Sequence, residues 1–325
     1  MRLHENKELY KDAILATAQL KGIPEIYIEK DYWVTLALNR IFTSNSGKDA
    51  IFKGGTALSK CFNIIERFSE DIDLVMLRDD TVTNNQLKAK IKKLSNLVAE
   101  TLPEIEVDGI TNKMGMIRKT AHSYQKTFEG RFGQVRDSII VEFTWLGSFE
   151  PYSTATISSF IAEMMYATNQ DALIEEYKLN PFEVQVVSME RTLCEKIMSL
   201  VRFSFTDDPI TDLNNKIRHV YDIYKLLENT AVNTFFNSLE FDNLLINVAN
   251  DDLISFKNNN DWLINHPATA LIYADFENTW SQMRNTYNTT FKDLVYSELP
   301  PEAKMTETLK TVYNRIASVN WIISK

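Results

Sequence analysis

The spacing of apolar and polar positions predicts helices and strands in alternation along the first part of the chain. Residues 5–22 and 25–42 read as two helices, split at Gly22 and Pro24, where helix stop and start signals fall. The apolar run "AIFK", which ends just before Gly54, is too short for a helix and predicts a strand.

A helix and a second strand follow this first strand. Leu58, Cys61 and Ile65 are spaced by three and four positions, as on one face of a helix. We therefore predict a short amphipathic helix over residues 56–68, beginning just after the glycines. The stretch "DIDLVM", residues 71–76, returns to alternation and predicts a strand. Strand, glycine turn, helix and strand together make an α/β unit.

The rest of the chain changes from mixed structure to helices. A helix is predicted over residues 84–101, and β-branched and aromatic residues predict a strand over 138–147. From about residue 190 the pattern is almost wholly helical, and the best loop candidates there are 207–215 and 265–270.

This order of elements predicts the fold class and its division. We expect an α/β (α+β) protein in which a mixed sheet with helices is followed by a mainly α-helical half. The expected boundary separates residues 1–187 from residues 188–325.

Composition is that of a soluble globular protein. The chain has 325 residues, 44% of them apolar and 24% charged, enough for a substantial core. Its apolar runs are too short to span a membrane and its first residues lack a signal peptide, so we expect a cytoplasmic protein. Cys61 and Cys194 lack the spacing of a zinc site and are expected to fill helices as small buried residues. The histidines form no metal-binding pattern, so any metal would have oxygen ligands.

The net charge of -9 argues against non-specific coating of nucleic acid, although one stretch is basic. Six cations stand between residues 113 and 136 against a single acid, Glu129. This strip could face a polyanion such as RNA, or it could be a solvated hairpin. Its cations are Lys113, Arg118, Lys119, Lys126, Arg131 and Arg136.

Two aspartates in the second predicted strand suggest a metal site. Alternate side chains of a strand point the same way, so Asp71 and Asp73 should share a face. Two carboxylates about 7 Å apart repel each other unless a cation lies between them. Mg²⁺ suits such a pair and leaves positions for phosphate oxygens. An acidic pair alone is weak evidence, since such pairs at strand ends usually face solvent or form salt bridges.

The preceding glycines strengthen this interpretation. Gly54 and Gly55 lie just before a predicted helix, where backbone N–H groups and absent side chains favour the close approach of a phosphate. Thr56 could cap that helix or add a hydroxyl to the phosphate. The sequence has neither a Walker-A loop nor an EF-hand loop here. We therefore expect the glycines to hold the triphosphate of a nucleotide whose metals the aspartates bind.

Five ordered motifs carry a resemblance to a known family. The turn and strand look like the nucleotidyltransferase superfold shared with polymerase β. More narrowly, the chain resembles the AbiEii family of bacterial nucleotidyltransferase toxins, which are paired with an antitoxin in abortive-infection and toxin–antitoxin modules. The resemblance covers about residues 24 to 230 and lies in "IEKDYW", "FKGGTALSK", "ERFSEDIDL", "SMERTLCEKIMSL" and "RHVYDIYKL".

The resemblance implies further site residues. It assigns Lys196 to the nucleotide phosphates and Asp222 to the active site, although Asp222 could instead form a helix salt bridge with Arg218, four residues earlier. Glu142 stands where the superfold often has a third carboxylate, a position at which this family varies. Arg67 and Ser69 match the family pattern and could position the turn or touch phosphate. "IEKDYW" contains Lys30 and Asp31, to which the sequence assigns no role, and Tyr32 and Trp33, which should pack in the core.

The hypothesis is a Mg²⁺-dependent transfer of a nucleotide. Asp71 and Asp73 would bind two Mg²⁺ ions that clamp the phosphates of an NTP, while a hydroxyl of the acceptor attacks the α-phosphorus and pyrophosphate leaves. The resemblance implies the 3′ end of tRNA as acceptor, with the basic strip gripping its backbone. A hydroxyl of a protein is the alternative acceptor, as in AMPylation. A module that binds NTP or antitoxin without turnover is the alternative of another class, and a sugar transferase with a D-x-D motif is a more distant one.

Overall fold

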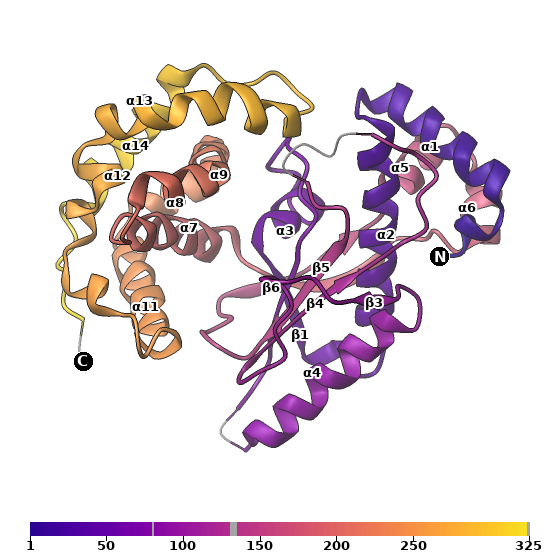
Figure 1. Cartoon of the computed structure of the whole chain (residues 1–325), viewed down its shortest axis with the longest axis horizontal. Helices are drawn as coiled ribbons and strands as arrows, with labels where there is room; N and C mark the ends of the chain where they lie inside the picture. Colours follow the sequence, from indigo (N-terminus) through magenta and orange to yellow (C-terminus); the bar gives the residue numbers. More distant parts are fainter. Residues whose placement is uncertain (80, 131–134, 324–325) are drawn as a thin grey trace. The chain divides into compact units, whose positions relative to one another are not determined.

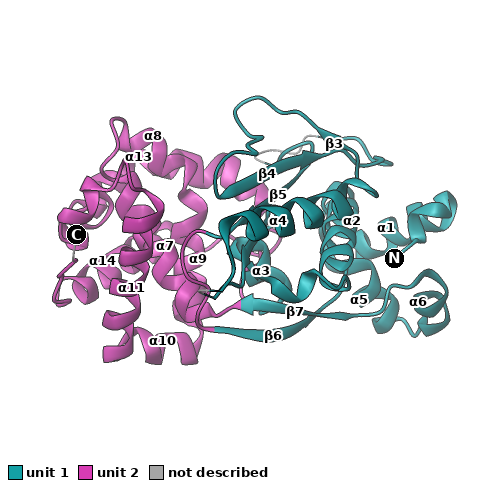
Figure 2. Cartoon of the chain, turned by 90° about the horizontal axis from the view of Figure 1, so that it is seen from below, with its two compact units in different colours: residues 1–63, 67–145, 152–186 teal, residues 64–66, 146–151, 187–325 magenta. Residues whose placement is uncertain are grey.

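A computed structural model describes residues 1–79, 81–130 and 135–323. These residues divide into two compact units, coloured separately in Figure 2. Unit 1 comprises residues 1–63, 67–145 and 152–186, and unit 2 comprises 64–66, 146–151 and 187–325. The expected fold class is confirmed, since unit 1 carries a mixed sheet and unit 2 is helical.

The sheet of unit 1 has seven strands in the order β3-β4-β5-β2-β1-β7-β6. β2, which carries the acidic motif, pairs antiparallel with β1 on one side and parallel with β5 on the other. The sheet is therefore mixed at this strand. The strands are β1 Ala50–Lys53, β2 Ile72–Met76, β3 Glu104–Ile105, β4 Ile117–His122, β5 Ile139–Thr144, β6 Tyr152–Ile157 and β7 Phe182–Val187.

Helices of unit 1 cover one face of this sheet and extend beyond its edge (Figure 1). The long helix α2 packs against α1, α4, α5 and β5. Apolar side chains of β2 and β5, including Leu74 and Phe143, are fully buried. The helices are α1 Lys7–Lys21, α2 Glu25–Phe42, α3 Gly54–Lys60, α4 Asn84–Ala99, α5 Phe160–Ala167 and α6 Asp171–Tyr177.

Unit 2 is built from helices around the apolar faces of α7 and α9. α7 packs on α9 and α11, and α9 packs on α10 and α14. Cys194 on α7 is fully buried, as expected for a small core residue. The helices are α7 Met189–Phe203, α8 Pro209–Asn215, α9 Ile217–Glu228, α10 Thr230–Phe236, α11 Leu239–Ser255, α12 Leu271–Ala274, α13 Phe276–Thr286 and α14 Glu302–Ile316.

Several predicted elements have the expected bounds. β1 and α2 begin and end at the predicted residues, and Gly22 ends α1 in the left-handed conformation with φ 66°. Tyr32 and Trp33 are buried in the core, as expected. Among the helices of the described residues, none combines the length and the apolar character needed to cross a membrane.

Three local predictions are wrong: the length of the helix after the glycines, the place of Cys61 inside it, and the loop at 207–215. The helix predicted over 56–68 ends at Lys60, because Asn63 takes a left-handed conformation with φ 52° that a helix cannot include. Consequently, Cys61 follows the helix and is only partly buried. The predicted loop at 207–215 contains α8, whose start is explained by Asp208 capping the N–H of Thr211 and by a proline in its first turn. The predicted loop at 265–270 contains a single 3₁₀ turn, Pro267–Thr269.

Candidate active site

The predicted acidic residues lie in a row of charged side chains across four neighbouring strands of unit 1, with two acids between two lysines. Asp73 of β2 pairs in register with Lys53 of β1 on one side and with Glu142 of β5 on the other. Glu142 in turn pairs with Lys119 of β4. Side chains of directly paired residues lie on the same face of a sheet, so these four project together. Asp71, two residues before Asp73, belongs to the same face.

Repulsion within this row changes the acidity of its central member. Burial, followed by the charges of Glu142 and Asp71, raises the pKa of the Asp73 carboxyl to about 7. Lys119 Nζ lies 2.9 Å from Glu142 Oε2 and balances that carboxylate. Although burial opposes the charge of Lys119, its pKa is raised, because Glu142, Asp73 and Asp71 surround it. Burial and the two neighbouring carboxylates therefore both favour the protonated form of Asp73.

The two glycines lie directly against this row. A Cβ atom on Gly54 would stand 2.6 Å from Asp73 Oδ2, and Gly54 has a φ of +84° that disfavours any side chain. A Cβ atom on Gly55 would stand 2.8 Å from Arg67 Nη2 and 2.9 Å from Ser69 Oγ. The bare backbone of the turn is thus required by close packing against three of the predicted site residues, which explains the spacing seen in the sequence.

Thr56 and Ser69 fix the main chain at the start of β2. The Thr56 hydroxyl donates to the Asp71 carbonyl oxygen at 2.7 Å and lies 3.1 Å from Ser69 Oγ. The predicted capping role of Thr56 is wrong, because the N-cap of α3 is Lys53 and α3 begins at Gly54, not after the glycines. Arg67, nearly fully buried, donates to the Phe68 carbonyl. A phosphate contact by these residues stays a prediction.

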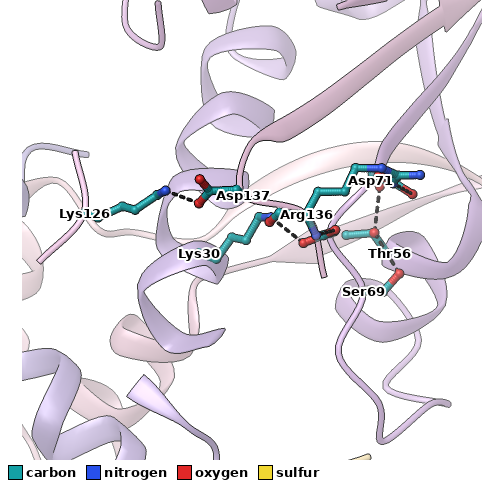
Figure 3. Close-up of polar contacts among 8 residues, drawn as sticks. Lys30, Thr56, Ser69, Asp71, Lys126, Arg136 and Asp137 are labelled. Carbon is teal, nitrogen blue, oxygen red and sulfur yellow. Dashed lines mark hydrogen bonds and ion pairs between the residues drawn. The ribbon is translucent and has the colours of Figure 1, made fainter. Parts of the chain in front are cut away.

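Arg136 binds Asp71, a contact that the sequence did not predict (Figure 3). Its Nη1 lies 3.0 Å from Oδ1 and 3.2 Å from Oδ2 of Asp71. The main chain of Arg136 is held by a buried ion pair, in which Lys30 Nζ lies 2.5 Å from Glu70 Oε2. Glu70 Oε1 accepts the Arg136 N–H at 2.8 Å, and Lys30 donates to the Arg136 carbonyl.

The neighbours of Lys30 on α2 anchor other segments in the same way. Glu29 accepts the N–H groups of Thr127 and Phe128, at 2.6 and 3.2 Å. Asp31 pairs with Lys60 at the end of α3 at 2.5 Å and accepts the Phe160 N–H at 2.8 Å. Three consecutive buried charges of α2 therefore hold several separate segments of unit 1. This gives the motif "IEKDYW" a structural role.

The described cations of the basic strip are each paired with an acid. Lys113 and Arg118 pair with Glu104, and Lys126 pairs with Asp137. Lys119 and Arg136 pair with Glu142 and Asp71, as described above. Arg131 lies outside the described residues. The sequence stretch held one acid, but the fold supplies four more from other positions, which the local charge count could not reveal.

Lys196 and Asp222 form a buried ion pair within unit 2. Lys196 Nζ of α7 lies 2.7 Å from Asp222 Oδ2 of α9, and both side chains are almost wholly buried. Asp222 is thus an anionic partner of Lys196. Sequence reasoning missed His219, one helical turn before Asp222, whose pKa is lowered well below its ordinary value by burial and by Lys196. That Lys196 and Asp222 act together with the residues of unit 1 stays a prediction.

The donor chemistry of the row fits a hard divalent cation. Asp71 and Asp73 offer carboxylate oxygens, which Mg²⁺ prefers, and Glu142 adds a third carboxylate paired in register with Asp73. Within the part of the chain that the structure describes, no three His, Cys, Asp or Glu side chains are already gathered around a metal position. In this arrangement the Arg136 guanidinium supplies the positive charge at Asp71.

Comparison with protein families identifies the family of this chain. The model of the family described as "Nucleotidyl transferase AbiEii toxin, Type IV TA system" matches residues 36–313. The chain therefore belongs to the AbiEii family of nucleotidyltransferase toxins. It is a nucleotidyltransferase, and the type IV toxin–antitoxin system named for the family implies an antitoxin partner.

Comparison with individual proteins adds little. A similar solved structure is the nucleotidyltransferase toxin MenT4 from Mycobacterium tuberculosis H37Rv, with 16% identity and a TM-score of 0.43 over 94% of this chain and 98% of that chain. The curated proteins gave no significant match. The family match begins after "IEKDYW" and continues well beyond residue 230, so the resemblance extends through most of the helical half.

Proposed function

We propose that this toxin transfers a nucleoside monophosphate from an NTP to the 3′ end of tRNA in a Mg²⁺-dependent reaction. The observation that carries the proposal is the contact between the glycine turn and the acidic row. The missing Cβ of Gly54 leaves room for Asp73, and that of Gly55 leaves room for Arg67 and Ser69, so a bare backbone, a carboxylate and a guanidinium lie close together beside the face that carries Asp73. Such a face suits the phosphates of a nucleotide together with a cation.

Residues of unit 1 would position the metal and the nucleotide phosphates. Asp71 and Asp73 would hold two Mg²⁺ ions, with Glu142 paired in register with Asp73. The metal supplies charge neutralisation and orientation of the phosphates when it is bound. Gly54 and Gly55 leave room for phosphate oxygens, while Thr56 keeps the main chain of Asp71 in place.

The remaining predicted residues would bind the phosphates or activate the acceptor. Arg67 and Ser69 border the glycine turn, where they would bind phosphate oxygens. Lys196 would offset the charge of the leaving pyrophosphate, and Asp222 would hold its ammonium group in position. The acceptor hydroxyl would be deprotonated by Glu142, whose carboxylate Lys119 keeps on the same face.

Support for an RNA acceptor comes from the basic strip. Its described cations are paired with carboxylates that a phosphate backbone could replace, since Lys113 and Lys126 pair only at the surface. A protein acceptor would not need these cations. Neutralising Lys113 and Lys126 should therefore weaken transfer to RNA more than it changes NTP binding.

The proposal is tested by following labelled nucleotide. The protein is incubated with Mg²⁺ and each α-labelled NTP, together with purified tRNA and cell protein, and the labelled fraction is identified. Mass spectrometry of the tRNA then gives the added mass and its position. We expect label at the tRNA 3′ end. Label in protein, or nucleotide binding without transfer, would overturn the proposed acceptor or the proposed turnover.

The Asp71→Ala variant assigns the reaction to this site. We expect transfer to fall below detection while the far-UV circular dichroism spectrum and the melting temperature stay close to those of the parent, because Asp71 is partly exposed. Lys90→Ala removes a partly exposed ion pair with Asp49 elsewhere in unit 1 and serves as the control that should retain transfer. Transfer retained by Asp71→Ala would refute the assignment.

A further inference from the structure

Arg136 has a fixed main chain and a side chain placed on a predicted metal ligand. Its N–H group and carbonyl are bound by Glu70 and Lys30, whose side chains are 2% and 0% exposed. Its guanidinium, by contrast, is 39% exposed and contacts both oxygens of Asp71 through one nitrogen. The anchor is therefore buried, and the side chain that it carries is partly accessible.

Arg136 and a divalent cation would compete for the Asp71 carboxylate. A cation bound between Asp71 and Asp73 would repel a guanidinium that lies 3.0 Å from Asp71 Oδ1. A partly exposed ion pair contributes only about 0–1 kcal/mol, so a divalent cation can displace it. The main-chain bonds to Glu70 and Lys30 would survive this displacement, because they do not involve the guanidinium.

We propose that Arg136 is a displaceable occupant of the cation position at Asp71 and a ligand of the nucleotide phosphates. Before metal binds, the guanidinium balances Asp71. When the cation takes its place, the side chain turns about its fixed main chain to the phosphates, whose oxygens a planar guanidinium binds well. This inference rests on the proposed function. It adds that Arg136 binds Asp71 before the metal arrives and the phosphates afterwards.

One variant tests both parts of the inference, because it should bind the metal more tightly and the nucleotide more weakly. Arg136→Ala should bind Mn²⁺ alone about two- to fivefold more tightly, because the competing ion pair is gone. The same variant should bind a non-hydrolysable NTP more weakly in the presence of Mn²⁺, because a phosphate ligand is gone. Mn²⁺ binding is measured by electron paramagnetic resonance and nucleotide binding by calorimetry, neither of which requires turnover.

Two further variants make the result specific. Lys90→Ala removes a cation from an ion pair with Asp49 that has similar exposure, 35% and 39%, and should change neither affinity. Asp71→Asn should weaken Mn²⁺ binding, and adding Arg136→Ala to it should then give no gain in affinity. A loss of unit 1 structure does not explain tighter metal binding, so the opposite signs exclude a general folding effect.

Each outcome decides a different claim. If Asp71→Asn does not weaken Mn²⁺ binding, the proposed metal site fails and the inference fails with it. If Asp71→Asn weakens binding but Arg136→Ala does not tighten it, or does not weaken nucleotide binding, the exchange of partners is overturned and the metal site stands.

Discussion

At the scale of single residues, the acidic row shows how neighbouring strands change the pKa of an aspartate. Asp73 lies between Lys53 and Glu142 on neighbouring strands, and burial with nearby carboxylates raises its pKa to about 7. The glycine turn fits against the same carboxylate. The site therefore depends on atoms that are absent, the Cβ atoms of two glycines, as much as on charged groups.

Gly54→Ala should reduce transfer strongly. A Cβ atom there would stand 2.6 Å from Asp73 Oδ2 and would force Asp73 to move, in addition to the strain of a φ of +84°. Gly109→Ala is the matched control, because Gly109 has a φ of +70° and open space around it. Both variants should lose about 1 kcal/mol of stability from backbone strain, measured by denaturant unfolding. Equal transfer by the two variants would contradict the role of the Gly54–Asp73 contact.

The sequence predicts the ligands of this site but not their partners. The glycine turn and aspartates are local patterns, so spacing along the chain was sufficient to find them. Lys119 and Arg136 appeared only as members of a basic strip, since their pairing with Glu142 and Asp71 depends on strand register and on a loop conformation. Local charge counts do not contain that information.

At the scale of elements, α2 links the parts of unit 1 through buried charges. Glu29, Lys30 and Asp31 follow one another and bind several different segments. The bounds of α2 were predictable from Gly22, Pro24 and the pattern that follows. The end of α3 was not, because it depends on the left-handed conformation of Asn63 rather than on the apolar spacing, which continues beyond Lys60.

Lys30→Met should destabilise the protein by about 3–5 kcal/mol, because Glu70 would remain buried without its cation. The double variant Lys30→Met, Glu70→Gln should recover much of this loss, since a neutral amide can still accept the Arg136 N–H. Free energies of unfolding from urea titrations measure both effects.

Lys21→Met is the control for this pair of variants. Its ion pair with Glu163 is partly exposed, so the expected loss is below about 1 kcal/mol. If Lys30→Met and Lys21→Met cost the same, the buried pair does not stabilise α2 in the way described.

At the scale of the whole molecule, the two units are interleaved along the chain. Residues 64–66 belong to unit 2, although residues on both sides of them belong to unit 1. Glu66 donates its N–H to Tyr221 Oη at 3.3 Å, accepts the Tyr296 N–H at 3.1 Å and pairs with Lys225 at 3.0 Å. A single boundary near residue 187 therefore captures most of the division but misses the short segments that cross it.

Hydrogen exchange should group residues 64–66 with unit 2. As denaturant rises, their amides should lose protection together with those of α9, because Tyr221 and Lys225 of α9 hold Glu66. They should not follow α3, which is nearer in sequence. Exchange followed by mass spectrometry resolves these segments, and exchange in step with residues 54–60 would contradict the division.

The crossing segment has a consequence for the order in which a ribosome completes the toxin. Ile65 and Glu66 leave the exit tunnel long before Tyr296, whose hydroxyl and N–H bind their carbonyl groups. At about 5–20 residues per second, the intervening synthesis takes on the order of ten seconds or more. Throughout that interval the stretch leading to Arg67 and Asp71 lacks its contacts with Tyr296, so this segment takes its final conformation only after residue 296 has been synthesised.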